Sequence, residues 1–96
     1  MKNYIGQKVI VRSYEAGVYF GTLEEKDGTE VRLSNARNIW KWEGATCLSQ
    51  AAVEGIASTS KVSVVVPEMI ITGVCQIIPC SVKAIENIES IAVWEY

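Results

Sequence analysis

The sequence predicts an α+β fold in which a small antiparallel sheet packs with two short helices. Apolar and polar residues alternate through residues 7–35, which is typical of strands in a meander. Small apolar residues recur at helical spacing through residues 48–56, and β-branched residues dominate residues 61–78. Together these patterns indicate about five to six strands. A chain of 96 residues forms a single domain, here residues 1–96.

The first strand is predicted over Gln7–Tyr14, where large side chains alternate and occupy both faces. A strand of this kind lies inside a sheet rather than at its wet edge. Glu15–Gly17 follows as a turn, because Gly17 can adopt positive φ. The chain then returns as a second strand over Val18–Glu25.

Asp27 and Gly28 predict a hairpin with a type I′ turn. The third strand follows over Glu30–Asn35. The next segment either continues as an extended strand or restarts after a bulge at Asn35 and Ala36. If it is extended, one face carries Asn38, Trp40 and Trp42, and the other carries Arg37, Ile39 and Lys41.

A helix is predicted after residues 44–46, with Thr46 as a possible N-cap and Gly55 near its end. Its buried stripe is formed by Leu48, Ala51, Ala52, Gly55 and Ile56. Two strands are predicted next, over Lys61–Val66 and Ile70–Ile78, each followed by a proline.

Ser81 predicts the N-cap of a second helix over Val82–Ser90. That helix is expected to bury Val82, Ile85 and either Ile88 or Ile91. The last five residues, 92–96, are mostly apolar, so we expect them to dock on the sheet or on a neighbouring subunit.

Composition limits the classes of partner. Apolar residues make up 49% of the chain, which is high for so small an interior and favours a homo-oligomer. The formal net charge of −2 argues against a DNA or RNA polymer as partner. The apolar runs are too short to span a membrane, and no secretion leader is recognisable.

Metal binding and catalysis are both disfavoured by the residue types present. The chain has no histidine, and its three cysteines lack the spacing of a zinc site. We expect these cysteines to be small buried hydrophobic residues in a reducing cytosol. Cys47, at a predicted helix start, is the best-placed nucleophile, but no base accompanies it. We therefore expect a non-catalytic protein without a cofactor.

Ligand-binding groups are most concentrated in residues 35–46, which combine cations, amides and indoles. Arg37 lies among neutral amides, so an internal partner is not evident and a ligand role is favoured. For Arg32, a structural cross-strand pairing with Glu30 or Glu24 and a ligand role are equally favoured. Trp40 and Trp42 are either core anchors or stacking platforms. Tyr14 and Tyr19 flank the Gly17 turn and either close over a ring or pack on the turn.

Four segments of the sequence also carry a family resemblance. They are VIVRSYEAGVY at 9–19, NARNIWKWEGA at 35–45, LSQ at 48–50 and IIPCS at 77–81. The sequence resembles the phage Thoeris anti-defence proteins of the first type over nearly its whole length. The second segment is the most specific part of the resemblance. The link at residues 57–61 is shorter than in that family.

The resemblance implies a sponge: a protein that binds cyclic ADP-ribose signals, and in some members cyclic oligonucleotides such as cyclic oligoadenylates, without altering them. It implies a homodimer or a hexamer built as a trimer of dimers, ligands between protomers, and action in the host bacterial cytoplasm. Combined with the residue chemistry, it assigns phosphate contacts to Arg12 and Arg37, and base or ribose contacts to Asn35 and Asn38. It assigns the stacking of adenine to the ring of Tyr14, Tyr19 or Trp40.

A different class of function is compatible with the same sequence. An interaction module of a phage could inhibit a host protein through an apolar oligomer surface, with Arg37 serving only the structure. Substitution of Arg37 separates the two hypotheses, because only the sponge hypothesis requires it for ligand capture.

Overall fold

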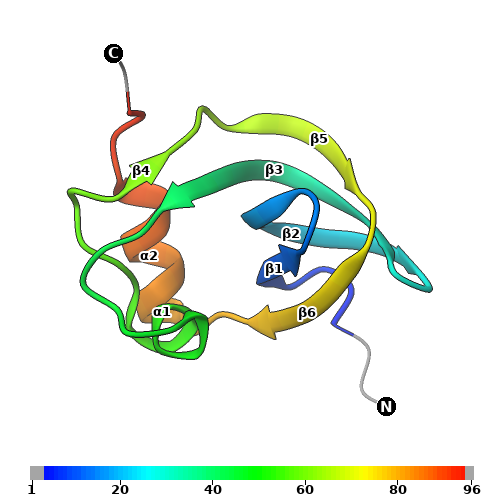
Figure 1. Ribbon diagram of the computed structural model, residues 1–96, viewed down its shortest axis with the longest axis horizontal. Helices are drawn as coiled ribbons and strands as arrows, with labels where there is room; N and C mark the ends of the chain where they lie inside the picture. Colours follow the sequence, from blue (N-terminus) through cyan, green and yellow to red (C-terminus); the bar gives the residue numbers. More distant parts are fainter. Residues whose placement is uncertain (1–3, 95–96) are drawn as a thin grey trace.

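Six antiparallel strands and two helices form the structure, which confirms the α+β class (Figure 1). The computed structural model describes residues 4–94. The strands are β1 (Lys8–Ser13), β2 (Gly17–Asp27), β3 (Glu30–Lys41), β4 (Lys61–Val62), β5 (Val66–Ile71) and β6 (Val74–Pro79). The helices are α1 (Leu48–Glu54) and α2 (Val82–Ser90).

The sheet curls into a half-open barrel. Its order is β4-β3-β2-β1-β6, and β5 also pairs with β3. In a flat sheet, β5 and β6 would lie about 19 Å apart, at four strand spacings. The step from Ile71 to Val74 spans at most about 11 Å, so the two strands must approach each other. Figure 1 shows β5 and β6 enclosing the other strands and joined at one end.

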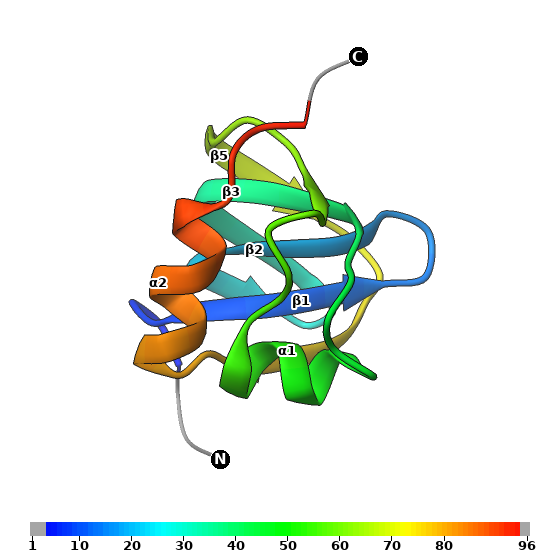
Figure 2. The ribbon, with the colours of Figure 1, turned by 90° about the vertical axis from the view of Figure 1, so that its left-hand side faces the viewer.

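Each face of the curled sheet has its own apolar core. The inner face gathers side chains from five strands: Val9, Val11, Leu23, Val31, Leu33, Ala36, Ile71 and Val74. The outer face packs Ile10, Phe20 and Ile39 against both helices. Figure 2 shows α1 and α2 in front of the strands on this side. The helices therefore cover only one face, and the inner face is closed by the curl itself.

The hairpin between β2 and β3 is where the sequence predicts it, but its turn type differs. Asp27 and Glu30 are paired, so the two loop residues are Gly28 and Thr29. Gly28 has a φ of +58°, and among residues 4–94 Asn35 alone shows positive φ without being glycine. Glycine at the first loop position with an ordinary second residue fits type II′, not type I′.

One extra residue in β3 changes which face its second half presents. Thr22 pairs with Ser34 and Phe20 with Arg37, so β3 carries an additional residue between these pairs. Asn35, with a φ of +49°, occupies this bulge. Because side chains alternate along a strand, the extra residue moves Arg37 to the outer face, under the helices. β3 runs without interruption from Glu30 to Lys41, and it contains a bulge at Asn35. The structure thus combines the two predicted alternatives, an extended strand and a bulge.

The strand boundaries after residue 60 differ from those predicted. The predicted strand Lys61–Val66 contains the two-residue β4 and the first residue of β5, and the predicted strand Ile70–Ile78 is divided between β5 and β6. Gly73, with a φ of +68°, turns the chain between them. Pro67 lies within β5 rather than after a strand, which an edge strand tolerates because a missing N–H can face solvent.

Helix α1 buries the predicted stripe, including Leu48, Ala51 and Ala52. Its N-cap is Cys47, so the prediction of Thr46 as the cap was wrong. Thr46 instead donates from its backbone N–H and hydroxyl to the Gln50 side chain, at 2.7 and 2.8 Å. Gly55 ends the helix with a φ of +88°.

Helix α2 has the predicted bounds and the predicted cap. The Ser81 hydroxyl accepts a hydrogen bond from the Ala84 N–H at 3.1 Å. The helix buries Ala84 and Ile88, and Ile91 is buried just beyond it. Val82, predicted to be buried, is exposed, because it lies on the solvent side of the first turn.

The end of the described chain docks on β4. The Trp94 N–H donates to the Val62 carbonyl at 3.0 Å, and its ring meets Trp40 edge to face with centroids 4.8 Å apart. This confirms docking on the sheet for Trp94. Residues 95–96 of the predicted tail lie outside the described residues.

The cysteines do not form the buried set that the sequence predicts. Cys47 and Cys75 are exposed, and Cys80 is half-buried. Burial raises the pKa of the Cys80 thiol to about 12. All three thiols are free.

Candidate functional site

A cavity of about 620 Å³ lies where β1, β2 and β6 meet the start of α1, and we call it the Arg12 cavity. Arg12 pairs across strands with Val18 on one side and Gln76 on the other. Directly paired residues present their side chains on the same face, so these three form a row on the helix side of the sheet. The residues of the cavity that carry its chemistry are Arg12, Tyr14, Trp42, Cys47, Ser49 and Gln76.

Arg12 and Tyr14, two of the residues predicted to bind a ligand, lie together at this cavity. The Arg12 guanidinium carbon lies 5.7 Å from the centroid of the Tyr14 ring, within range of a cation–π contact. Tyr14 is 84% exposed. Its turn is fixed by Ser13, whose hydroxyl donates to the Thr72 carbonyl and accepts from the Ala16 N–H.

The electrostatics of the Arg12 cavity favour an anion. Among residues 4–94, Arg12 is the one charged residue that lines the cavity, since no Asp, Glu or Lys of this range does. Within residues 4–94, no ion pair engages the Arg12 guanidinium. By contrast, Arg32 donates to Glu25 at 2.7 Å and lies 3.7 Å from Glu68. Arg12 therefore keeps its hydrogen-bonding fork available for a phosphate or carboxylate.

Cys47 places a thiol at the same cavity. A hydrogen bond from the Gln50 backbone N–H lowers the pKa of this thiol. The sequence has no histidine, and the cavity lining supplies neither lysine nor carboxylate. The thiol thus has a lowered pKa, and no residue of the cavity lining within residues 4–94 offers it a histidine, lysine or carboxylate as general base or acid.

Arg37, a predicted phosphate ligand, is buried in the interior. An exposed arginine without an internal partner was expected from the sequence, and that expectation was wrong. It is 3% exposed. Its Nε donates to the Ser63 carbonyl and its NH1 donates to the Ile88 carbonyl, both at 2.9 Å. Burial lowers the pKa of its guanidinium. The Asn35 bulge is the physical cause, because it turns Arg37 toward α2.

Asn38 and Tyr19 pair with each other beside the Gly17 turn, but neither lines the Arg12 cavity. The Asn38 amide donates to the Val18 carbonyl at 2.9 Å, so it ties β3 to β2. Tyr19 is half-buried against the inner core. Both therefore have structural contacts, and Asn38 supports the strand that carries Val18.

Asn35 and Trp40 are exposed and lie away from the Arg12 cavity lining. Asn35 occupies the bulge, where positive φ suits asparagine. Trp40 is 52% exposed and leans on Trp94, over which the Lys61 ammonium also sits at 4.5 Å. The structure thus joins Arg12 with Tyr14 and leaves the other five predicted residues outside that group.

Sequence reasoning assigned no ligand role to two polar residues that line the Arg12 cavity, Ser49 and Gln76, and it left Trp42 open between core anchor and stacking platform. Gln76 had a usable signal, since it is a lone amide in the apolar stretch Val74–Ile78. Its position opposite Arg12 depends on the pairing of β1 with β6, which joins residues more than sixty positions apart. Sequence periodicity carries no information about such a pairing.

Two further searches of the described residues gave negative findings. Within residues 4–94, no group of three or more His, Cys, Asp or Glu side chains could hold a metal ion. In the same range, neither helix has the length and apolar character needed to cross a bilayer.

The fold and the site define a small α+β half-barrel with a cationic surface cavity. Comparison with known families matches residues 6–88 to the family described as Domain of unknown function (DUF6948). Because the match covers most of the chain, the protein belongs to this family. No curated protein and no solved structure matches it.

Proposed function

We propose that this protein is a non-catalytic sponge that binds cyclic ADP-ribose-type immune signals, or related cyclic oligonucleotides, and so blocks the host effector that they activate. The proposal makes it a phage anti-defence protein of the Thoeris type, acting in the host bacterial cytoplasm. The sequence resemblance over segments 9–19 and 35–45 supports this assignment.

The observation that carries the proposal is the Arg12 cavity. It combines one available guanidinium, an exposed tyrosine ring 5.7 Å from it, and the amide of Gln76 on the facing strand. These groups match the parts of a cyclic nucleotide: phosphates, a flat base and ribose hydroxyls. The volume of about 620 Å³ lies within the usual range for small-molecule sites, about 300–1,000 Å³.

The energies involved are consistent with tight capture when several contacts act together. Nanomolar binding requires about −12 kcal/mol. A charge-assisted hydrogen bond contributes about 1.5–3 kcal/mol, and stacking of a base on an aromatic ring about 1–3 kcal/mol. A cyclic ligand has few rotatable bonds and loses little entropy on binding. The hydrogen bond and the stacking together fall short of the nanomolar value, so one cavity needs further contacts to reach it.

A second protomer is the natural source of those contacts. We infer a homodimer, or a trimer of dimers, in which exposed groups such as Asn35 and Trp40 of another copy face the ligand held at Arg12. The buried position of Arg37 assigns it to the stability of each protomer instead.

The direct test is depletion and recovery of the ligand. The protein is incubated with cyclic ADP-ribose variants, filtered to remove it with whatever it holds, and then heat-denatured. We expect the filtrate to lose the ligand and the denatured sample to return it with unchanged mass. Recovery of linear or hydrolysed product would identify an enzyme and overturn the sponge.

A matched pair of arginine variants separates the site from general charge effects. Arg12→Gln is expected to weaken capture about 10–100-fold, the loss of one charge-assisted contact. Arg32→Gln removes the same charge from a residue already paired with Glu25, and is expected to leave capture unchanged.

A second candidate is a phage interaction module that inhibits a host protein through an apolar surface. It is favoured by Val64, Val65 and Ile70, which are exposed along the segment that leads into and forms β5. Exposed apolar side chains on an edge strand commonly mark a protein interface. Under this candidate, Ile70→Glu abolishes inhibition of the host protein, whereas Arg12→Gln has no effect.

A further inference from the structure

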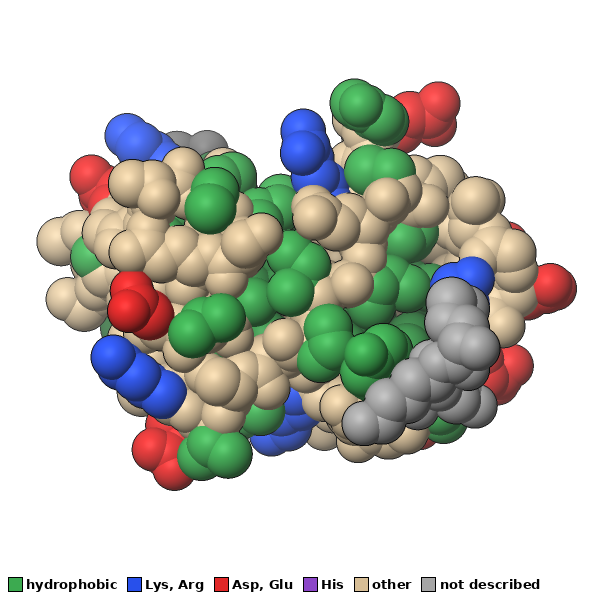
Figure 3. All heavy atoms as spheres, turned by 90° about the horizontal axis from the view of Figure 1, so that it is seen from below, with side chains coloured by type: hydrophobic (Ala, Val, Ile, Leu, Met, Phe, Trp, Pro, Cys, Tyr) green, Lys and Arg blue, Asp and Glu red, His purple; other side chains and the backbone are tan. Residues whose placement is uncertain are grey.

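A second cavity, of about 590 Å³, opens at the mouth of the half-barrel, and we call it the mouth cavity. Three separate segments form it: residues 4–5 before β1, the end of β2 with its hairpin turn (Leu23, Lys26, Gly28 and Thr29), and residues 74–77 of β6. Thr29 at the hairpin tip accepts a backbone hydrogen bond from Val74 at 2.9 Å, which holds the hairpin against β6. Figure 3 shows hydrophobic side chains gathered across the face on this side of the molecule.

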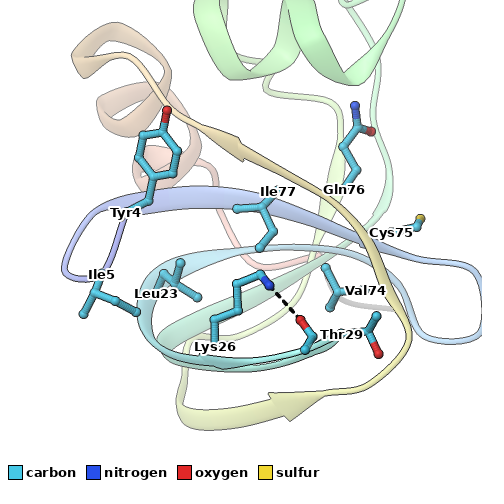
Figure 4. Close-up of a pocket in the computed structure, with 10 residues that line it drawn as sticks. Tyr4, Ile5, Leu23, Lys26, Thr29, Val74, Cys75, Gln76 and Ile77 are labelled. Carbon is cyan, nitrogen blue, oxygen red and sulfur yellow. Dashed lines mark hydrogen bonds between the residues drawn. The ribbon is translucent and has the colours of Figure 1, made fainter. Parts of the chain in front are cut away.

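The interior of the mouth cavity is apolar. Leu23 and Val74 belong to the inner core and lie at its base, and Ile77 packs beside them. Figure 4 shows Tyr4, Leu23 and Ile77 around a common space that Lys26 borders, while Cys75 and Gln76 point away from it. The cavity is therefore continuous with the inner core, and the helices, which cover the outer face, do not close it.

One cation stands at the rim of this apolar space. Among residues 4–94, Lys26 is the one charged residue that lines the cavity, and no Asp or Glu of this range does. Within the described part of the chain, the Lys26 ammonium donates one hydrogen bond, to the Gly28 carbonyl at 2.7 Å. An ammonium group has three donors, so two remain for a ligand, and the bond to Gly28 fixes where they are presented.

We propose that the mouth cavity binds a small amphipathic anion, namely a carboxylate on a medium-length hydrocarbon chain. The chain lies against Leu23, Val74 and Ile77, and the carboxylate accepts hydrogen bonds from Lys26. This chemistry differs from that of the Arg12 cavity, which has a guanidinium and polar walls. The two sites share only Gln76, whose side chain points away from the mouth cavity (Figure 4).

Apolar contact dictates how affinity depends on chain length. Each methylene buried in the cavity contributes enough to tighten binding about fourfold. Affinity should thus rise steeply from butanoate through hexanoate to octanoate, and level off once the cavity is filled. A ligand held only by Lys26 would show no such dependence.

The test is a titration of the full-length protein with butanoate, hexanoate, octanoate and octanol, followed by NMR of its methyl groups. We expect saturable shifts of the Leu23, Val74 and Ile77 methyl signals and tightening along the carboxylate series. Octanol should bind more weakly than octanoate by up to about fivefold, the effect of one exposed charge pair. Absence of saturable shifts, or equal affinity across the series, would overturn the proposal.

Variants locate the two halves of the site. Lys26→Met should reduce the affinity for octanoate to that for octanol, whereas Lys41→Met, at the far end of β3, should change neither. Ile77→Ala should weaken both ligands alike. If the same methyl signals shift with protein concentration alone, a second copy of the chain fills the cavity and the proposal fails. Unchanged octanoate binding by Lys26→Met would also overturn it.

Discussion

Arg12 and Arg37 are both strand arginines on the outer face of the same sheet, yet their surroundings are opposite. Arg37 lies beneath α2 and donates to two backbone carbonyls, one of them in the last turn of that helix. Arg12 lies where α1 leaves part of the face uncovered, and its described contact is the ring of Tyr14. One region of the face is closed by packing, and the other remains open as a cavity.

The two arginines are the same residue type on the same face of the sheet. Their contacts differ because α2 packs over Arg37, whereas α1 only borders the cavity at Arg12. A buried guanidinium is tolerated because Ser63 and Ile88 accept its hydrogen bonds, and because a helix C-terminus favours a cation. No carboxylate within residues 4–94 pairs with Arg37. The closed region should therefore govern stability, and the open region should govern binding.

Among the variants considered, Arg37→Met is expected to lower the free energy of unfolding the most. This change removes both hydrogen bonds and leaves buried carbonyls without their donors, so we expect a loss of about 3 kcal/mol in the free energy of unfolding. Arg12→Met should change it by less than about 0.5 kcal/mol. Urea denaturation of the two variants measures the contrast, and equal losses would contradict it.

Gly55→Ala should have the next largest effect, again in the closed region. Gly55 has a φ of +88°, and an added Cβ would lie 2.4 Å from the Asn87 side-chain oxygen. That oxygen accepts a hydrogen bond from the Ile56 N–H at 2.7 Å, which joins the two helices. Strain at such a position costs about 1–3 kcal/mol, measurable by thermal unfolding. A matched change at Gly6, where an added Cβ meets nothing within 4 Å, should cost less.

Ser81→Ala should lower stability by about 1 kcal/mol, because it removes the N-cap of α2. The Ser81 hydroxyl also donates to the Val53 carbonyl at 2.5 Å, so the change loosens the contact between the helices. Ser81→Asp keeps an acceptor for the Ala84 N–H and should recover part of the loss. If Ser81→Asp is no more stable than Ser81→Ala, the cap is not the cause.

The smallest expected effect is a difference in reactivity between the cysteines, which is measured on the unmodified protein. The pKa of Cys47 is lowered by the Gln50 N–H, whereas burial raises that of Cys80 to about 12. Alkylation proceeds through the thiolate, so at pH 8 Cys47 should react first and Cys80 last. Mass spectrometry of peptides after timed alkylation gives the order of reaction. Faster labelling of Cys80 than of Cys47 would contradict the burial of the Cys80 thiol.

The sequence predicted those elements whose signals are local. Ser81 and the spacing after it defined α2 to the residue, and the small-residue stripe defined the buried side of α1. Pro67 misled the assignment of β5, because an edge strand can accept a proline that a central strand excludes. Edge or central position is a property of the whole sheet.

The site was less predictable than the fold, for two physical reasons. A single residue in positive φ, Asn35, reversed the faces of the rest of β3 and carried Arg37 inside. The partner of Arg12 across the sheet, Gln76, comes from a strand far along the chain. The closeness of Arg12 and Tyr14 was predictable, because they lie two residues apart in the sequence beside the same turn.

The most direct test of the central claim is calorimetric titration of wild type, Arg12→Gln and Arg32→Gln with cyclic ADP-ribose variants. The open region around Arg12 predicts saturable binding by wild type and Arg32→Gln, and a 10–100-fold weaker interaction for Arg12→Gln, about the value of one charge-assisted contact. Binding that is equally strong in all three proteins, or no heat in any of them, would contradict the claim.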